Sequence, residues 1–257
     1  MTEIRSRDNA RVRRWRALAA DPRARRAEGR ALAEGEHLVS ALLDAGWKVQ
    51  ALLLAAGQAG RHAPLAARAG AAPVILSDAV FRSVADVETP SGIAAEFALP
   101  AREADLAAAP SCVFLDGIQD AGNVGAILRS AFAFGVKHAV LGQGCADAWS
   151  PKVLRAGMGA HFGLRVEEGA DLERGMARFG GRIACTVARD GEPLPAADLS
   201  GRVGWLLGAE GRGVDPGLAA RAALRVTIPM PGGAESLNVA AAAAICFYEL
   251  SRRAARS

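Results

Sequence analysis

The chain has 257 residues, of which 51% are hydrophobic, and a formal net charge of +4. This length allows one or two globular domains with a sizeable core, and the hydrophobic fraction excludes a disordered chain. No apolar run reaches the roughly 18 residues typical of a membrane-spanning helix, and the N-terminus is too rich in arginine for a signal peptide. We therefore expect a soluble, cytoplasmic protein with no membrane partner.

The predicted elements of the first 98 residues alternate between helix and strand. Helices are expected over residues 11–20, 36–45, 63–69 and 78–85, and strands over 30–34, 49–54, 73–76 and 93–97. The first helix should end near Asp21 and Pro22. Alternation at this spacing predicts a small α/β sandwich domain over residues 1–98. Residues 99–110 are rich in alanine and proline without an apolar period, which predicts a linker.

A second alternating segment covers residues 111–257. Strands are expected over 112–115, 137–141, 164–166, 182–188, 203–207 and 225–228, and helices over 123–134, 150–159, 172–179 and 216–221. A last, alanine-rich helix should follow Ser236, which we expect to act as its N-cap, just as we expect Asn123 to cap the helix 123–134. Strands alternating with helices indicate a parallel sheet.

The charge is uneven along the chain. Residues 1–30 contain ten arginines against four acidic residues. Guanidinium groups match phosphate oxygens and displace counterions, so this segment predicts a surface that binds nucleic acid. The alternative is a solvated helix face in a protein that is rich in arginine throughout. The candidate nucleic-acid contacts are Arg7, Arg11, Arg13 and Arg14.

The cysteines and histidines do not form a metal site by sequence. The four cysteines lie apart in apolar surroundings without a CxxC pair, and the four histidines are scattered. This pattern favours small core residues over disulfides or zinc ligands, so we expect no metal.

Three loops place polar residues between glycines directly after an apolar strand. They cover residues 116–129, 207–213 and 228–238. Since parallel sheets bind ligands beyond the carboxyl ends of their strands, these loops are candidate ligand sites. The glycines at 208, 211 and 213 suggest a nucleotide-binding loop, but the spacing is not GxGxxG and the loop lies late in the domain. A Rossmann-type nucleotide-dependent enzyme is therefore a weak alternative.

Taken together, the three loops resemble motifs 1, 2 and 3 of the SpoU/TrmH-type RNA 2′-O-ribose methyltransferases, in the SPOUT superfamily. The matching stretches are DGIQDAGNVGAILRSA at 116–131, LGAEGRG at 207–213 and IPMPGGAESLNV at 228–239. Ala121 and Ala209 depart from residues that are common in the family, proline and a small polar residue respectively. Residues 6–9, 34–36 and 89–93 are similar to the family's substrate-binding domain, which resembles a ribosomal-protein α/β sandwich.

This resemblance implies a C-terminal parallel-sheet SPOUT domain with a deep trefoil knot, built from about residue 182 to residue 248. It implies S-adenosylmethionine as cofactor, a homodimer, and RNA as the partner. The implied cofactor contacts are Leu207, Gly208, Ile228, Met230, Leu237 and Asn238. The implied catalytic residues are Asn123, Arg129, Glu210, Ser236 and Asn238.

The implied roles differ in what they demand chemically. In the family the counterpart of Arg129 is thought to activate the 2′-hydroxyl, often at the cofactor bound by the partner subunit. Lowering an arginine pKa to near 7 would require roughly 8 kcal/mol. A charged guanidinium that stabilises the developing oxyanion requires less free energy than this pKa shift. Both the neutral and the charged form of Arg129 are kept as alternatives. Asn123 and Arg129 are expected to face the same mouth.

The other implied residues have supporting roles. Glu210 would anchor the loops or Asn123, and Ser236 and Asn238 would orient the loop or the ribose. Purely structural bracing and helix capping are the alternatives for Glu210 and Ser236.

The sequence thus predicts an S-adenosylmethionine-dependent methyltransferase that modifies a ribose 2′-hydroxyl in RNA. A separate RNA-docking domain suits a large structured target, which favours ribosomal RNA over tRNA. A tRNA 2′-O-methyltransferase is one alternative. A non-catalytic RNA-binding assembly factor with the same fold is another, which the complete set of site residues disfavours.

Overall fold

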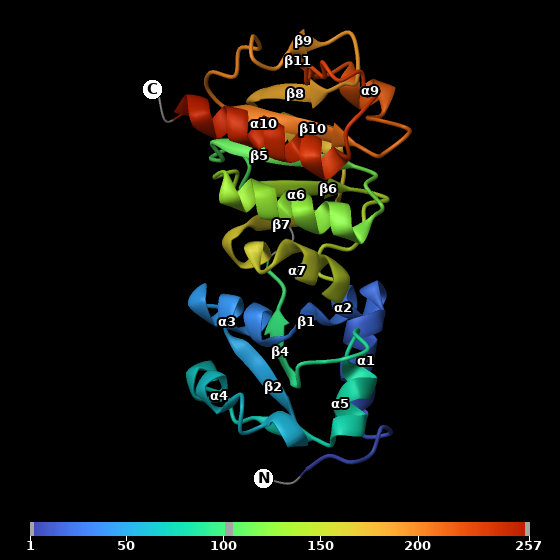
Figure 1. Ribbon diagram of the computed structural model, residues 1–257, viewed down its shortest axis with the longest axis vertical. Coiled ribbons are helices and arrows are strands. Elements are labelled where there is room, and N and C mark those ends of the chain that lie inside the picture. The colour runs from blue at the N-terminus through green and yellow to red at the C-terminus, as the bar shows by residue number, and fades with distance from the viewer. Residues whose placement is uncertain (1–2, 101–104, 255–257) are drawn as a thin grey trace. The chain divides into compact units, whose positions relative to one another are not determined.

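The structure, a computed structural model, describes residues 3–100 and 105–254 (Figure 1). The chain forms two compact units, and each is described by itself. Unit 1 comprises the chain up to Pro100 together with Trp149–Phe162, and unit 2 comprises the remainder. Residues 101–104 of the predicted linker lie outside the described residues. No described helix combines the length and the apolar character needed to span a bilayer.

Unit 1 is built on a four-stranded sheet in the order β1-β4-β2-β3. Its strands are β1 (Arg30–Glu34), β2 (Val49–Ala55), β3 (Val74–Leu76) and β4 (Ile93–Ala98). β4 is antiparallel to β1 and to β2, and β3 is parallel to β2. All four strands were predicted, to within one or two residues at each end.

Helices cover both faces of this sheet, because successive strand residues point to opposite sides. Leu53 of β2 packs with α1 (Ala10–Ala20) and α5 (Asp78–Val84), whereas its neighbours Leu52 and Leu54 pack with α3 (Glu36–Asp44) and α4 (Ala63–Ala69). The predicted α/β sandwich is therefore confirmed for this unit.

One helix of unit 1 was not predicted. α2 (Pro22–Glu28) follows α1 after a single residue, Asp21, whose side chain accepts a hydrogen bond from the amide of Arg23 at 2.8 Å. Asp21 ends one helix and caps the next, and Pro22 occupies the first helical position, where its missing N–H is harmless. The predicted end of the first helix near Asp21 and Pro22 is confirmed, and the same proline also begins α2.

A second unexpected feature of unit 1 is the segment Trp149–Phe162, which lies within residues 111–257 in the sequence. It contains α7 (Pro151–Gly157) and leads into the short 3₁₀ helix η2 (Ala160–Gly163). Trp149 and Phe162 pack against Trp47 and Phe97 with ring centroids 5.3–6.1 Å apart. The Trp47 indole N–H also donates to the Phe162 carbonyl at 3.0 Å. Burial of these rings fixes the segment in unit 1.

Unit 2 contains a seven-stranded sheet in the order β7-β6-β5-β10-β8-β11-β9, and every neighbouring pair is parallel. The strands are β5 (Ser111–Asp116), β6 (His138–Gly142), β7 (Arg165–Ala170), β8 (Arg182–Thr186), β9 (Glu192–Pro193), β10 (Val203–Gly208) and β11 (Leu224–Thr227). The predicted parallel sheet is confirmed. Only the two-residue β9 was not foreseen.

Helices also cover both faces of the sheet in unit 2. Phe114 of β5 and Leu206 of β10 pack in one core with α8 (Leu172–Phe179), and α9 (Pro216–Ala219) packs at its edge. Their strand neighbours Val113 and Trp205 point to the other face of the sheet and are fully buried there. There α6 (Ala121–Ala133) and α10 (Val239–Ala254) lie side by side over the sheet (Figure 1).

Residues 105–110 of the predicted linker contribute to the core of unit 2. Residues 105–110 form no helix or strand, yet Leu106 and Ala109 are buried in the same cluster as Phe179. The Arg202 guanidinium donates to the carbonyls of Ala109, Leu106 and Phe179 at 2.6–3.0 Å. Hydrogen bonds from a charged donor thus hold this irregular segment in place.

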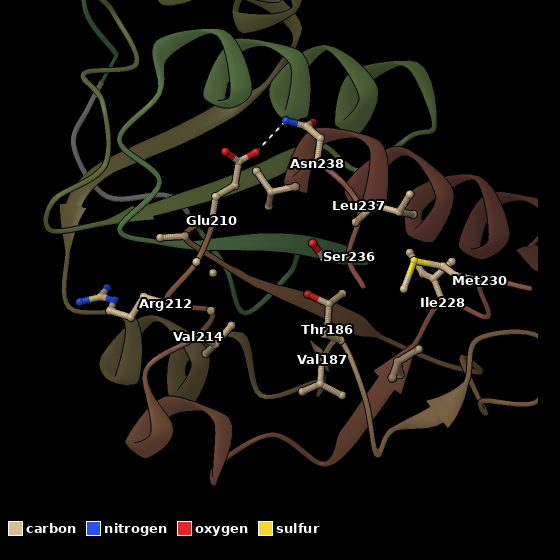
Figure 2. A pocket seen from close by; sticks show the side chains of 18 residues that line it. Thr186, Val187, Glu210, Arg212, Val214, Ile228, Met230, Ser236, Leu237 and Asn238 are labelled. Atoms are coloured by element: carbon tan, nitrogen blue, oxygen red, sulfur yellow. Dashed lines mark hydrogen bonds between the residues drawn. The ribbon is translucent and has the colours of Figure 1, made fainter. Parts of the chain in front are cut away.

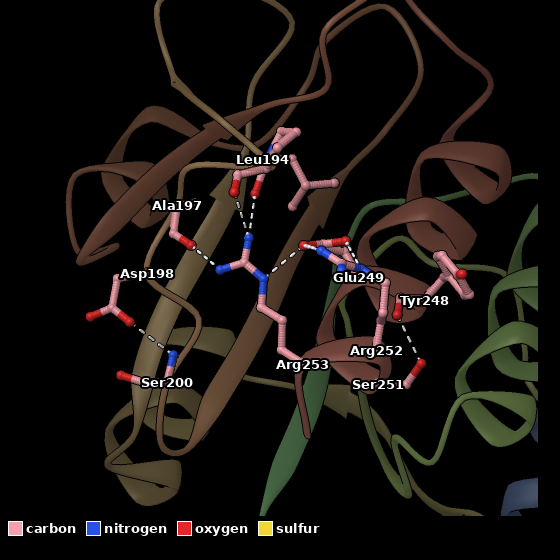
Figure 3. A network of polar contacts seen from close by, with 10 residues as sticks. Leu194, Ala197, Asp198, Ser200, Tyr248, Glu249, Ser251, Arg252 and Arg253 are labelled. Atoms are coloured by element: carbon pink, nitrogen blue, oxygen red, sulfur yellow. Dashed lines mark hydrogen bonds and ion pairs between the residues drawn. The ribbon is translucent and has the colours of Figure 1, made fainter. Parts of the chain in front are cut away.

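The C-terminal end of α10 is fastened to the connection between β9 and β10. Arg253 donates to the carbonyls of Leu194, Pro195 and Ala197 at 2.5–3.1 Å and to Glu249 at 2.7 Å (Figure 3). Hydrogen bonds from Arg252, and then from Arg253, lower the pKa of Glu249 to about 2. Because this pKa is below the usual 4.5, the contribution of Glu249 to stability is complete above about pH 4.5 and is lost as the pH falls towards 2.

We expect Arg253→Ala to lower the free energy of unfolding by about 2 kcal/mol, because hydrogen bonds from charged donors are worth about 1.5–3 kcal/mol. Arg252→Ala is the matched control. Among the described residues its side chain bonds only to Glu249 in the same helix, so the loss should be about 0.5 kcal/mol. Urea or thermal unfolding of both variants measures the difference. Equal losses would show that the carbonyl contacts of Arg253 contribute nothing.

Candidate active site

The three glycine-containing loops meet at one edge of the parallel sheet, as predicted. Strand β5 ends at Asp116 and β10 at Gly208, and these two residues are paired in register. β11 ends at Thr227 on the far side of β8 and leads into the third loop, residues 228–238. Carboxyl ends of parallel strands lie together, so polar side chains 28 to 115 residues apart in sequence converge here.

A hydrogen-bonded network joins one side chain from each loop. Glu210 Oε1 accepts from Asn123 Nδ2 at 3.1 Å and from Asn238 Nδ2 at 2.7 Å. Asn238 Nδ2 also donates to Asn123 Oδ1 at 2.9 Å. Figure 2 shows Glu210 and Asn238 joined across the gap between the second and third loops. The charged acceptor makes these bonds stronger than amide–amide bonds, so Glu210 braces the other two loops.

Asn238 has a second function at the start of α10. Its Oδ1 accepts from the amides of Ala240 and Ala241 at 3.0 and 3.2 Å, which caps the helix. The prediction that Ser236 is the cap was wrong, because the helix begins at Val239, two residues later than Ser236 requires. Both ends of the Asn238 amide are thus used, one for the helix and the other for the network.

The expected cap of α6 was also wrong. Asp120, not Asn123, precedes the helix and accepts from the Asn123 amide at 2.7 Å. Asn123 lies in the first turn, which frees its side chain for Glu210. Ala121, the departure from the family's common proline, occupies the first helical position, where either residue fits.

A cavity of about 630 Å³ opens between the second and third loops (Figure 2). Of the predicted cofactor contacts, Gly208, Ile228, Met230, Leu237 and Asn238 line it, together with Glu210 and Ser236. Leu207 is fully buried in β10 and does not line the cavity. Sequence reasoning missed Thr186 and Val187, which also line it. Their position at the carboxyl end of the buried strand β8 could have indicated them, since the ligand site was expected at this edge of the sheet.

The cavity suits a ligand with an apolar ring and polar ends. Its volume is within the range of small-molecule sites, and Ile228, Met230 and Leu237 supply an apolar wall beside polar groups of Glu210 and Asn238. Gly208 allows the second loop to fold back: a Cβ there would lie 2.2 Å from the Gly213 carbonyl carbon. Only glycine permits this approach. The residues present therefore fit S-adenosylmethionine, with its adenine ring and charged amino-acid end.

Arg129 is not part of this arrangement within one chain. It lies exposed on α6 and lines neither this cavity nor the second one that contains Asn123. The expectation that Asn123 and Arg129 face the same cavity opening was wrong. Six residues rotate a helix by about 600°, so the two side chains leave the helix in directions roughly 120° apart. Among residues 3–100 and 105–254, no hydrogen bond or ion pair engages its guanidinium.

Asp116 is a further polar residue that the sequence did not single out. Its Oδ2 accepts from the Asp215 amide at 2.7 Å, and its Oδ1 lies 3.6 Å from the Arg212 guanidinium. Both partners belong to the segment after β10. Asp116 therefore connects the first loop to the segment after β10, and Glu210 makes a second connection between them through Asn123. Its position as the first residue of motif 1 could have indicated that Asp116 belongs to the site.

The four arginines predicted to bind RNA differ in their surroundings. Arg7 and Arg13 are exposed. The Arg11 guanidinium lies 5.0 Å from the Trp15 ring centroid. Arg14 holds buried Glu96 with two hydrogen bonds of 2.8 Å and pairs with Glu28, so it stabilises unit 1. RNA contact by these residues stays a prediction.

The Arg14 interaction keeps Glu96 charged in the core. Burial by itself would raise the pKa of Glu96, but hydrogen bonds from Arg14 and from the Trp15 indole bring it below its usual value. A buried carboxylate needs such partners.

The cysteines are not reactive groups of the site. All four are free, and Cys112, Cys185 and Cys246 are buried, as predicted. Burial raises the pKa of Cys185 to about 11 and that of Cys246 to about 12, which keeps the thiols protonated. Among the described residues there is no group of three His, Cys, Asp or Glu side chains arranged to hold a metal ion.

Comparison with known proteins matches both halves of the chain. The family model of the SpoU rRNA Methylase family matches residues 110–248, and that of the MRM3-like substrate binding domain matches residues 9–95. Bacillus subtilis 23S rRNA (guanosine(2553)-2′-O)-methyltransferase RlmP is 34% identical over 97% of this chain and 99% of its own length.

Solved structures agree with this match. The AdoMet-bound rRNA methyltransferase from Sinorhizobium meliloti has a TM-score of 0.84 at 28% identity, covering 98% of both chains. The SpoU methyltransferase AviRb from Streptomyces viridochromogenes, in complex with AdoMet, has a TM-score of 0.82 at 25% identity, covering 96% of this chain and 98% of AviRb. The chain belongs to the SpoU rRNA methylase family, as its three loops indicated.

Proposed function

We propose that this protein transfers the methyl group of S-adenosylmethionine to a ribose 2′-hydroxyl of ribosomal RNA. Membership in the SpoU family makes it an S-adenosylmethionine-dependent RNA 2′-O-ribose methyltransferase. The observation that carries the proposal is the network of Asn123, Glu210 and Asn238 at the rim of the 630 Å³ cavity, which brings all three motifs together.

Each part of the site has a role in this reaction. Ile228, Met230 and Leu237 would hold the adenine ring, and main-chain groups of the second and third loops would read its edge. When bound, S-adenosylmethionine supplies an electrophilic methyl group on a sulfonium centre. Glu210 and Asn238 fix the loops around it, so that the 2′-hydroxyl can be aligned with the methyl group.

Ribosomal RNA is the substrate that we favour. RlmP is named for a guanosine of 23S rRNA, and the match to it spans 97% of this chain. The substrate-binding domain matched at residues 9–95 also suits a large folded RNA. A tRNA target and a non-catalytic assembly factor remain the alternatives, and the intact set of site residues argues against the second.

We also propose that the active form is a homodimer. Arg129 lines neither the 630 Å³ cavity nor the second cavity that contains Asn123, so a second subunit would have to bring it to a cofactor site. The paired helices α6 and α10 carry apolar side chains that suit such an interface: Phe132, Ile245 and Tyr248 are 48%, 39% and 54% exposed. Apolar side chains on adjacent helices favour association with a like surface.

Two further expectations belong to this proposal. A trefoil knot over residues 182–248 is in keeping with the strand order, because β10 lies between β5 and β8 whereas β11 lies beyond β8. A cytoplasmic location is in keeping with an RNA substrate and with four free cysteines.

The test is methyl transfer from labelled S-adenosylmethionine to total rRNA and tRNA from a strain that lacks this protein. We expect label in ribosomal RNA at one ribose 2′-oxygen, and none in RNA from the wild-type strain, where the position is already modified. Label in tRNA alone would redirect the proposal to tRNA. Tight RNA binding without transfer to either RNA would favour the assembly factor.

A further inference from the structure

A second cavity, of about 500 Å³, lies beside the cofactor cavity in unit 2. Three loops and Asn123 of α6 line it. The loop residues are 117–120 after β5, 143–144 after β6, and Ala209, Glu210 and Arg212 after β10. Ala209, Glu210 and Arg212 line both cavities. A group held in the second cavity therefore adjoins any ligand in the first.

The shape of the second cavity is set by contacts between these loops. The Ala146 amide donates to the Ile118 carbonyl at 2.9 Å, which joins the loops after β5 and β6. Gly117 has φ +64°, and a Cβ at this position would lie 2.7 Å from the Arg212 guanidinium. The positive φ of Gly117 is a backbone conformation that favours glycine, whereas the exposed end of Arg212 could move aside for a larger residue. These contacts hold the cavity open before any ligand enters.

The lining offers unused hydrogen-bonding groups. The Gln119 and Gln143 amides come from two different loops, are exposed, and form no hydrogen bond with any described residue. Asp120 uses one carboxylate oxygen to cap α6, at 2.7 Å from the Asn123 amide, and its other oxygen is not engaged by the described residues. The set therefore combines one charged acceptor with two groups that can each donate and accept.

This set matches the Watson–Crick edge of guanine. Guanine presents two neighbouring donors, N1–H and N2–H₂, beside the acceptor O6. A carboxylate accepts from the two donors and an amide N–H₂ donates to O6. No other RNA base places two adjacent donors on this edge. Proteins that read single RNA bases do so on such unstacked edges.

We propose that the cavity bounded by residues 117–120, 143–144 and 209–212 binds the base of the target nucleotide, a guanine. Asp120, Gln119 and Gln143 read its Watson–Crick edge. The ribose then lies at the wall formed by Glu210 and Arg212, next to the cofactor cavity. This inference rests on the proposed function and adds the specificity residues to it.

The test uses the full-length protein and an RNA fragment that carries the mapped target nucleotide, either as guanosine or as inosine, which lacks the N2 amino group. We expect wild-type protein to prefer guanosine by about tenfold in kcat/KM, as for loss of one base contact. Asp120→Asn keeps the helix cap, because asparagine caps as well as aspartate, but removes the charged acceptor. It should lower kcat/KM on guanosine RNA and abolish the preference over inosine.

The glutamines are tested on the same substrates. Gln119→Ala and Gln143→Ala should each raise the KM for RNA about tenfold. Binding of S-adenosylmethionine, measured by calorimetry, should be unchanged and also reports that the variants are folded. Gln50→Ala, at an exposed glutamine of β2 in unit 1, is the matched control and should change nothing.

The outcomes separate the two proposals. If the wild-type protein transfers no methyl group to RNA, the proposed function is wrong, and this inference is wrong with it. If the wild-type protein is active but all three variants keep its KM and its preference for guanosine, only the base-binding cavity is wrong.

Discussion

Arg129→Ala is expected to reduce methyl transfer to RNA by about 100- to 1,000-fold, the usual effect of removing one group that stabilises a developing oxyanion. Affinity for S-adenosylmethionine should not change, because the expected contact of the Arg129 guanidinium is with the developing 2′-oxyanion of the RNA and not with the cofactor. Single-turnover transfer and calorimetry measure the two quantities. Arg129→Lys should recover only part of the rate, since lysine keeps the charge but not the planar, forked donor.

Mixed dimers test how Arg129 reaches the site. Arg129→Ala protein, whose cofactor cavity is intact, is refolded or co-expressed with a variant whose cavity is damaged but whose Arg129 is present. If Arg129 acts across the interface, each mixed dimer has one complete site, and an equal mixture should regain roughly a quarter of the wild-type rate. If Arg129 acts within its own chain, no complete site forms and no activity returns. Full activity of Arg129→Ala alone would remove the residue from the reaction.

Asn238→Asp is the second substitution with a large expected effect. The aspartate keeps an oxygen to cap α10, but it places a second carboxylate at the position from which Asn238 Nδ2 now donates to Glu210 at 2.7 Å. The hydrogen bonds to Glu210 and Asn123 are replaced by repulsion between like charges. We expect the cofactor affinity and kcat/KM to fall by about 10- to 100-fold, as for loss of a charge-assisted hydrogen bond. The helix content should stay the same.

The pH dependence of this variant provides a control. When two carboxylates lie at hydrogen-bonding distance, the second ionisation is disfavoured by the first charge, so one of the two pKa values of the pair is raised. Lowering the pH should then protonate one of them, restore a donor between the two, and recover part of the cofactor affinity. Asn238→Ser, which caps the helix but adds no charge, should show a smaller loss and no such recovery. A loss of equal size in both variants would exclude repulsion as the cause.

The local elements were readable from the sequence wherever the chain itself sets them. The helices 63–69 and 172–179 and the strand 30–34 have the predicted bounds, because each combines a clear apolar pattern with a glycine or another turn signal at its end. The three loops were correctly placed at the carboxyl edge of a parallel sheet. That placement needs only the order of strands and helices along the chain.

Helix caps were less predictable, although they too are local. Asp120 and Asn238 each stand within three residues of the caps that we expected, Asn123 and Ser236. Aspartate, asparagine and serine, the three residue types at these four positions, accept hydrogen bonds from a helix N-terminus about equally well. Which residue caps each helix depends on the tertiary contacts that the side chains of these loops make elsewhere. Asn123 and Asn238 face Glu210 because the sheet brings that carboxylate between them.

The sequence by itself determined the strands, the parallel sheet, the family and the residues of the three loops, because these depend on apolar periodicity and on motifs that are continuous in the chain. Only the tertiary structure decided which side chains meet. It placed Trp149–Phe162 in unit 1, where aromatic rings are buried, and Arg129 away from the cofactor cavity of its own chain. It also joined Asn123, Glu210 and Asn238, which are 28 to 115 residues apart. Such long-range contacts leave no periodic pattern along the chain, since they depend on the register between strands.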